Sequence, residues 1–259
     1  VTVTGTDNCI GSSATAAFTI AKKQLDLPSG TYSANYDGKV QYPNVGALYT
    51  VEGVTNAGTH SVAVAIKDTS NYEWSAAASA AEKVVTFTIS KVNTTLTITA
   101  PSTPYTASPY NKVTYESNVP GATVIYHYYS DAALTNKLSG APVERGTYYV
   151  VAEIAETDNF TGIVTQAKEF TINKAAPTLS FGDYTADAWY QNNLKAQGIE
   201  YSATGIGGVV LNGSFSYDKE TIKFAPADSL ASQTVAISVT FTPTDANYRE
   251  TTVSVNVCL

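Results

Sequence analysis

Methionine is absent from this 259-residue sequence, cysteine occurs twice, and charged side chains are scarce. Charged residues make up 14% of the chain, against about 25% in an average soluble domain. The 15 lysines and arginines are outnumbered by 22 aspartates and glutamates, so the net charge is −7. Because no basic stripe is available to neutralise phosphates, nucleic acids and anionic membranes are disfavoured as partners. Two cysteines are too few for a disulfide scaffold, and their spacing does not suit a zinc site.

Long apolar runs are missing as well. None approaches the roughly 20 residues that a membrane-spanning helix needs, so no membrane insertion is expected in this segment. No basic-then-apolar leader opens the chain, which starts inside a repeating pattern at "VTVTGTDN". We therefore expect a piece of a longer polypeptide whose export or anchoring signals lie elsewhere.

The residues that are plentiful predict β-structure. Hydrophobic residues make up 44% of the chain and tyrosine occurs 18 times, a composition that can bury cores and that favours strands. In "HSVAVAIK" the alternation places Val62, Val64 and Ile66 on one face, which predicts a sheet with one buried side. The same period predicts buried positions in "YYVVAEIA" and "KEFTINK", with Glu153 in solvent: Tyr148, Val150, Ala152, Ile154, Phe170 and Ile172. Only "SAAASAAEK" (Ser75–Lys83) differs, and it predicts an enlarged loop or one helical turn.

A short turn-like pattern occurs four times, and the segments around it repeat too. The copies are "GTDNC" ending at Cys9, "DTSNY" at Tyr72, "ETDNF" at Phe160 and "TDANY" at Tyr248. The last two intervals are both 88 residues, and the first is 63. An alternating strand precedes and follows each copy, as expected of tandem repeats. We predict three full modules, at residues 24–91, 92–174 and 175–259, preceded in residues 1–23 by the closing strand pair of another module.

The spacing of strands and turns predicts the fold class. Short alternating strands in units of about 70 to 90 residues are typical of all-β, two-layer antiparallel sandwiches of the immunoglobulin-like type, here arranged in tandem. The joins between modules, such as "FTISKVNTTLTI", run from one strand almost directly into the next without a Gly/Ser tract. Because such joins restrict hinging, we expect an elongated and fairly stiff rod.

The stretch "ERGTYYVVAEIAETDNFTG…KEFTINKAAPTL" resembles the ends of bacterial immunoglobulin-like repeats in cell-surface and adhesin proteins. Shared features are Gly-Thr-Tyr, a Val/Ala strand, an Asp-Asn-aromatic turn, Phe-Thr-Ile and a lysine before the next module. "ANYDGKVQYP" is similar to the Tyr-Asp-Gly signature of a related repeat group. The resemblance covers nearly the whole chain and weakens in the third module, where "SLASQTVAISV" lacks Gly-Thr-Tyr. It implies tandem β-sandwiches at a bacterial surface that act as spacers or adhesive modules, usually without catalysis, and it supplies no catalytic residue.

The acidic turns raise the question of calcium. Asp7, Asp158 and Asp245 offer hard oxygen ligands in loops near module ends. Calcium needs six to eight oxygens, however, and each turn supplies only one or two carboxylates. We favour the alternative that the Asp and Asn side chains cap their own backbone, while the aromatic residue that follows plugs the end of the core. No cofactor is predicted.

Clustered aromatic residues are the best candidates for ligand contact. They are Trp74, Tyr126, Tyr128, Tyr129, Trp189 and Tyr190. Aromatic rings on a sheet face can stack on sugars or anchor a protein partner. The alternative, which we favour, is that alternate members belong to the core and the others form cross-strand pairs.

Histidine-based catalysis finds little support in the sequence. His60 and His127 are the only histidines, and nothing resembles a nucleophile elbow. His60 stands in "AGTHSV" where the next module has Tyr148 in "RGTYYV". We predict that it fills a corner position and hydrogen-bonds the backbone, as the tyrosine corner of immunoglobulin sandwiches does. No catalytic residue is predicted, and the chain is not expected to be an enzyme.

Covalent cross-links are considered at two places. Cys9 stands where other copies have an aromatic residue, so we expect a small buried hydrophobe there, and Cys258 ends the last strand. Far apart in a rod, the two are expected to be free thiols or to bridge between molecules. Lys39 and Lys112 recur at one strand position and suit, weakly, an isopeptide bond to Asn or Asp.

The sequence thus predicts a non-catalytic spacer region of a bacterial cell-surface or secreted extracellular protein, with adhesion to a host or surface glycan or protein as a further role. The chain is expected to be monomeric. Two alternatives stay open: a carbohydrate- or host-protein-binding module that uses the Tyr and Trp clusters, and accessory domains of a secreted polysaccharide-acting enzyme.

Overall fold

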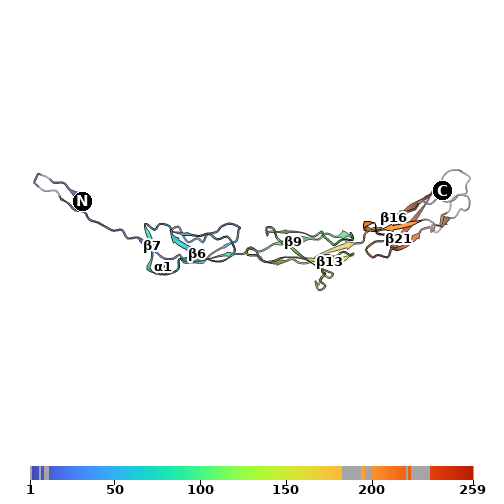
Figure 1. The fold of residues 1–259 in the computed structure, drawn as a ribbon, viewed down its shortest axis with the longest axis horizontal. Helices are drawn as coiled ribbons and strands as arrows, with labels where there is room; N and C mark the ends of the chain where they lie inside the picture. Colours follow the sequence, from blue (N-terminus) through green and yellow to red (C-terminus); the bar gives the residue numbers. More distant parts are fainter. Residues whose placement is uncertain are drawn as a thin grey trace. The chain divides into compact units, whose positions relative to one another are not determined.

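The structure is a computed structural model that describes residues 2–5, 7–8, 12–182, 194–195, 200–219, 221–222 and 234–258. It is nearly all β and holds several separate sheets (Figure 1). The chain divides into two compact units. Unit 1 is Val1–Asn93 together with Glu156–Thr161, and unit 2 is Thr94–Ala155 together with Gly162–Leu259. Among the described residues, no helix is long and apolar enough to cross a membrane.

Unit 1 is built around a four-stranded sheet. Its strand order is β4 (Tyr32–Asn35), β8 (Val84–Ser90), β6 (Gly58–Ile66) and β5 (Tyr49–Val51). The β4–β8 pair is parallel, and the other two pairs are antiparallel. Two small sheets complete the unit: β3 (Lys23–Leu25) runs parallel to β7 (Tyr72–Trp74), and β1 (Thr2–Val3) pairs with β2 (Ser12–Ser13).

The core of unit 1 lies on the predicted face of β6. Val62, Val64 and Ile66 are all buried, and the alternating residues between them are exposed, so this prediction is confirmed. They pack with Phe87 and Ile89 of β8, of which only 2% and 1% are exposed.

One helical turn interrupts the strands of unit 1, which is one of the two alternatives that the sequence left open for this stretch. This is α1 (Ala76–Ala80). It begins after Ser75, whose hydroxyl accepts a hydrogen bond from the Ala78 amide at 3.2 Å, so a polar side chain caps the free N–H groups of the first turn. It ends where Ala81 takes an extended conformation.

Unit 2 contains more sheets. The largest has the order β10 (Thr103–Pro104), β15 (Lys168–Asn173), β13 (Gly146–Ile154) and β12 (Ile125–Tyr129), with β14 (Ile163–Val164) also paired to β13. The other sheets are β9 (Leu96–Thr99) with β11 (Thr114–Ser117), β16 (Thr178–Phe181) with β18 (Tyr201–Thr204), β17 (Leu194–Lys195) with β20 (Thr221–Ile222), and β19 (Gly213–Tyr217) with β21 (Thr234–Pro243) and β22 (Thr251–Cys258). A 3₁₀ turn, η2 (Ile206–Gly208), follows β18.

The two largest sheets share one topology. In each, a short strand lies parallel to a closing strand (β4 to β8, β10 to β15), and the closing strand pairs antiparallel with a nine-residue strand that begins at a glycine. Those glycines are Gly58 and Gly146. These two glycines are 88 residues apart, the interval found between copies of the turn, so the sequence repeat corresponds to a repeated pattern of strand pairing.

The core of unit 2 has three centres among the described residues, one of which consists of Leu96, Ala152 and Ile154. Around Phe170, Tyr110 stacks with ring centroids 3.9 Å apart, and the side chain of Val150 is fully buried. Of the positions predicted for β13 and β15, Tyr148 is only partly buried and the other five are buried. Val151 is buried too, on the face that the alternation had assigned to solvent. The third centre consists of Ile237 and Val239 on β21, packed against the rings of Phe181, Tyr201, Phe215 and Tyr217.

Candidate functional site

The aspartates considered for calcium lie apart from other ligands. Asp7 and Asp158 are exposed, and Asp245 is half-buried. The Asp245 Oδ1 accepts the Asn247 amide at 2.8 Å, which is the backbone capping that we favoured over a metal. Within the described ranges, no three His, Cys, Asp or Glu side chains come close enough together to hold a metal ion.

The aromatic candidates are divided between faces. Trp74 stacks on Tyr49 with ring centroids 5.8 Å apart and contacts the core of unit 1. Tyr126 and Tyr128 pack against the Phe170 core, and Tyr128 is buried. Tyr129 is half-buried on the opposite face of β12. Trp189 and Tyr190 lie outside the described residues.

His60 occupies the predicted corner position. Its Nε2 lies 2.9 Å from the Asn56 carbonyl oxygen, and since a carbonyl only accepts, Nε2 carries the proton. The Tyr148 hydroxyl donates to the Glu144 carbonyl at 2.9 Å, in the same way four residues back along the chain. The prediction that His60 replaces a corner tyrosine is confirmed.

His127 lies on the outer face of β12, where its Nε2 is 3.0 Å from the Glu153 Oε2 of β13. Glu153, predicted in solvent, is partly exposed and is held by this contact. The lysines considered for isopeptide bonds, Lys39 and Lys112, are both exposed. Cys9 and the side chain of Cys258 are outside the described part of the structure.

The recurrent turn is where the structure adds most. We name its three described copies the Asn–aromatic turns: Asp68–Tyr72 and Thr157–Phe160 in unit 1, and Asp245–Tyr248 in unit 2. In each copy the asparagine carbonyl accepts the amide of a join residue, namely Lys23, Val92 or Ala175, at 2.8 to 2.9 Å. The chain beyond the aromatic residue pairs back to the same join residue in parallel, as in the Arg249 amide that donates to the Ala175 carbonyl at 2.8 Å.

In unit 2 the asparagine side chain also contacts the two residues that precede a strand distant in sequence. The Asn247 Oδ1 accepts the Arg145 amide at 2.8 Å, and its Nδ2 donates to the Glu144 carboxylate. Only 6% of Asn247 is exposed. The side chain thus satisfies a backbone N–H immediately before β13, and a buried amide that is hydrogen-bonded through both its oxygen and its nitrogen fixes position as well as register.

The aromatic residue of the same turn packs between two other segments. We call the whole arrangement a seat: the join residue, the asparagine with its partner before a strand, and the packed aromatic ring. Only 4% of Tyr248 is exposed, and its ring meets the Tyr105 ring edge-on at 5.6 Å. Its hydroxyl accepts the Ile206 amide at 2.8 Å. Gly205 leaves room for this ring, because a Cβ there would lie 2.3 Å from the tyrosine oxygen.

Unit 1 has a second seat of the same design. The Asn159 Oδ1 accepts the Ala57 amide at 2.8 Å, one residue before β6, and its Nδ2 donates to the Asn56 Oδ1 at 3.3 Å. The Phe160 ring meets the Tyr36 ring edge-on at 5.7 Å. A lysine of the join, Lys91, donates to the Thr157 carbonyl at 2.8 Å and pairs with Glu156.

From the sequence, the asparagine of the turn was expected only to cap its own backbone, and its contact with a distant segment was not predicted. Asn8, Asn71, Asn159 and Asn247 are present in all four copies. That constancy was the available signal, because a residue that only caps its own turn can be exchanged for Asp or Ser. The expectation that Asn caps its own backbone is wrong for Asn159 and Asn247, whose side chains bond to residues just before β6 and β13, 102 residues or more away in sequence.

No protein-family model matches this chain, and no curated protein matches it in sequence.

Proposed function

We propose that this chain is a non-catalytic spacer region of a bacterial cell-surface protein, built of tandem immunoglobulin-like β-sandwiches in an elongated rod, with adhesion as a further role. The observation that carries the proposal is the Asn–aromatic turn, because it forms two seats. In both, the asparagine oxygen accepts an amide that precedes a strand, and the aromatic ring meets a tyrosine edge-on. A spacer needs joints that resist bending, and each seat ties a join residue, a turn and a strand start together.

The join in unit 2 illustrates how such a joint resists bending. Ala175 has 5% of its surface exposed and is hydrogen-bonded on both sides, through its amide to Asn247 and through its carbonyl to Arg249. A join held by backbone bonds cannot rotate freely without breaking them, unlike a Gly/Ser linker. Length then adds with each repeat, while each core stays separate.

Binding through aromatic residues is the second candidate, and the favouring observation is the exposed Tyr42, with 62% of its surface in solvent, beside Val40, with 53%. A ring on the surface of unit 1 is available for stacking on a sugar or a protein partner. A glycan array and a host-cell binding assay separate this candidate from a pure spacer.

Small-angle scattering on the 259-residue chain tests the spacer proposal. We expect the profile of a thin, extended particle with little flexibility. A profile of a compact sphere would overturn the rod, and a flexible-chain profile would overturn the stiff joints.

A further inference from the structure

Two apolar side chains near the start of unit 1 are almost completely exposed. They are Phe18, with 85% of its surface in solvent, and Ile20, with 83%. The corresponding pairs, each ending two residues before the join lysine, are fully packed: Phe87 with Ile89, and Phe170 with Ile172, at 1–3% exposure. The segment therefore has the inward-facing pattern of a closing strand, but no sheet among the described residues covers it.

The joint that follows this segment is half formed. The Lys23 amide donates to the Asn71 carbonyl at 2.9 Å, as Val92 and Ala175 do in their seats. Lys22 donates to the Thr69 carbonyl at 2.7 Å, as Lys91 does to Thr157 at 2.8 Å. The contacts between join and turn are thus complete.

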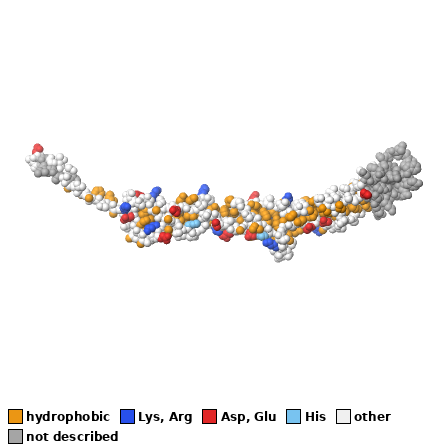
Figure 2. Space-filling view, in the orientation of Figure 1, with side chains coloured by type: hydrophobic (Ala, Val, Ile, Leu, Met, Phe, Trp, Pro, Cys, Tyr) orange, Lys and Arg blue, Asp and Glu red, His pale blue; other side chains and the backbone are white. Residues whose placement is uncertain are grey.

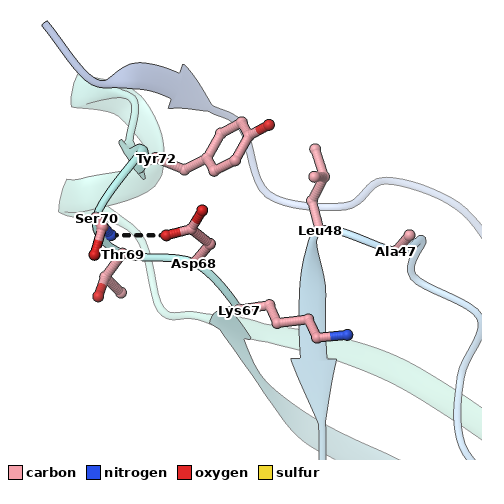
Figure 3. A pocket seen from close by; sticks show the side chains of 7 residues that line it. All are labelled: Ala47, Leu48, Lys67, Asp68, Thr69, Ser70 and Tyr72. Atoms are coloured by element: carbon pink, nitrogen blue, oxygen red, sulfur yellow. Dashed lines mark hydrogen bonds between the residues drawn. The ribbon is translucent and has the colours of Figure 1, made fainter. Parts of the chain in front are cut away.

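In the part of the chain that the structure describes, this copy makes no contact like those that the other two copies make to the residues before β6 and β13. Asn71 is exposed, and its Nδ2 turns back to the Asp68 Oδ2 at 2.8 Å. Its Oδ1, the atom that accepts a strand amide in the other two copies, receives no hydrogen bond from the residues described. Among the described residues, no aromatic ring packs against the Tyr72 ring, whereas Phe160 and Tyr248 each meet a tyrosine edge-on. It borders a hollow that is also lined by Leu48, Lys67 and Asp68 (Figure 3).

We propose that Phe18, Ile20, Asn71 and Tyr72 form one interaction surface, and that its occupant is a β-sandwich of this same kind that lacks its closing strand. The open sheet of the occupant takes residues 16–21 as its last strand and covers Phe18 and Ile20. Backbone hydrogen bonds along the added strand provide the affinity, and the two apolar pockets provide the register. At the end of the occupant, an amide before a strand-starting glycine donates to the Asn71 Oδ1, and a tyrosine meets Tyr72 edge-on.

The two filled seats identify this occupant. In both of them, the closing strand that carries the Phe and Ile pair leads into the same joint whose turn accepts the strand amide. One occupant therefore explains both the uncovered apolar pair and the unused asparagine oxygen. The inference rests on the joint in the proposed spacer function, but its readout is amide exchange at named residues and not the dimensions of the particle, so the two can fail separately.

The test extends the chain with its own sequence. A copy of residues 24–63 is placed ahead of Val1, so that Val1 and Val3 continue the strand as Val64 and Ile66 do. A second version carries residues 92–151 instead, and a scrambled 24–63 extension is the control. In at least one ordered extension we expect amides 16–21 to become strongly protected from hydrogen exchange, together with the copied residue that precedes the strand-starting glycine.

Two substitutions then locate the surface. In the protected extension, N71A should expose the copied amide again while residues 16–21 stay protected, and F18S/I20S should remove protection of that strand. Fast exchange of the amides of residues 16–21 in both extensions would overturn the proposal. So would protection of the copied amide before the strand-starting glycine that neither N71A nor Y72A reduces. Protection of residues 16–21 in the unextended chain together with a doubled mass in sedimentation would assign the surface to a second copy and overturn this occupant.

Discussion

At the scale of single residues, an asparagine side chain links the turn to a segment that is distant in sequence. Asn247 is buried and bonds through both of its polar atoms, to the Arg145 amide and to the Glu144 carboxylate. Asn71, the equivalent residue in the copy at Asp68–Tyr72, is exposed, and among the described residues it bonds only within its own turn and to the Lys23 amide. Asn71 and Asn247 thus occupy the same position of the turn but differ in burial, so the effects of replacing each one can be compared directly.

N247A should destabilise the joint of unit 2 by about 1–3 kcal/mol, because it leaves the Arg145 amide without its acceptor. The measurement is hydrogen exchange at the Arg145 amide, which should become faster by the corresponding factor. N71A is the matched control. It should change the free energy of opening at other amides, as derived from hydrogen exchange, by no more than about 0.5 kcal/mol, the usual range of surface substitutions. Equal effects of N71A and N247A would show that the buried contact contributes nothing.

Two core tyrosines predict the behaviour of the fold at high pH. Burial raises the pKa of Tyr110 to about 12 and that of Tyr201 to about 12, with the charge of a neighbouring tyrosine as the lesser cause in each. An unfolded tyrosine has a pKa of about 10. Because the folded pKa is higher, the stability linked to these groups is complete below pH of about 10 and is lost as pH rises through about 12.

Ultraviolet titration of tyrosinate should therefore show a late phase to which Tyr110 and Tyr201 contribute, and Y110F should reduce that phase by one phenol. Y110F also loses the hydrogen bond to the Pro101 carbonyl at 2.7 Å, so a small loss of stability at neutral pH is expected as well. If all phenols of the folded chain titrate together near pH 10, the burial of these rings is not as described.

At the scale of the elements, alternation predicted the inner faces of the long strands well. The buried positions of β6 and β15 are those that a period of two selects, since each strand has one face on a core. Val151 on β13 was missed because the outer face of that strand also carries the His127–Glu153 contact, and a period of two cannot show what covers a second face. The seats were missed for a similar reason: a turn's partner 102 residues away leaves no local pattern.

The corner at the start of β6 and β13 is a prediction at this scale. His60 and Tyr148 both donate to the carbonyl four residues back, so H60Y should keep the bond and nearly all of the stability. H60F keeps an aromatic ring without a donor and should cost about 0.5–1.5 kcal/mol, and Y148F should cost a similar amount. Urea unfolding followed by fluorescence measures both, and H60Y that is as unstable as H60F would contradict the shared role.

At the scale of the whole molecule, side-chain chemistry separates the surface from the joints. Charged residues of the described part of the chain are scattered over the visible face without a large patch of one sign (Figure 2). Specific contacts concentrate instead where joins meet turns. The proposed stiffness therefore depends on few atoms, and a small change at a join should have a large mechanical effect.

Insertion of Gly-Gly between Lys174 and Ala175 tests that dependence. The insertion moves Ala175 out of register with Asn247 and Arg249, so the backbone bonds on both of its sides are lost while the cores around Phe170 and Val239 stay intact. Small-angle scattering should then show a more flexible particle, and the Arg249 amide should lose protection from exchange. The same insertion between Ser139 and Gly140, in an exposed loop, is the control and should alter neither readout, because surface loops tolerate added length. A Lys174 insertion that leaves the scattering profile unchanged would mean that the join does not set the stiffness.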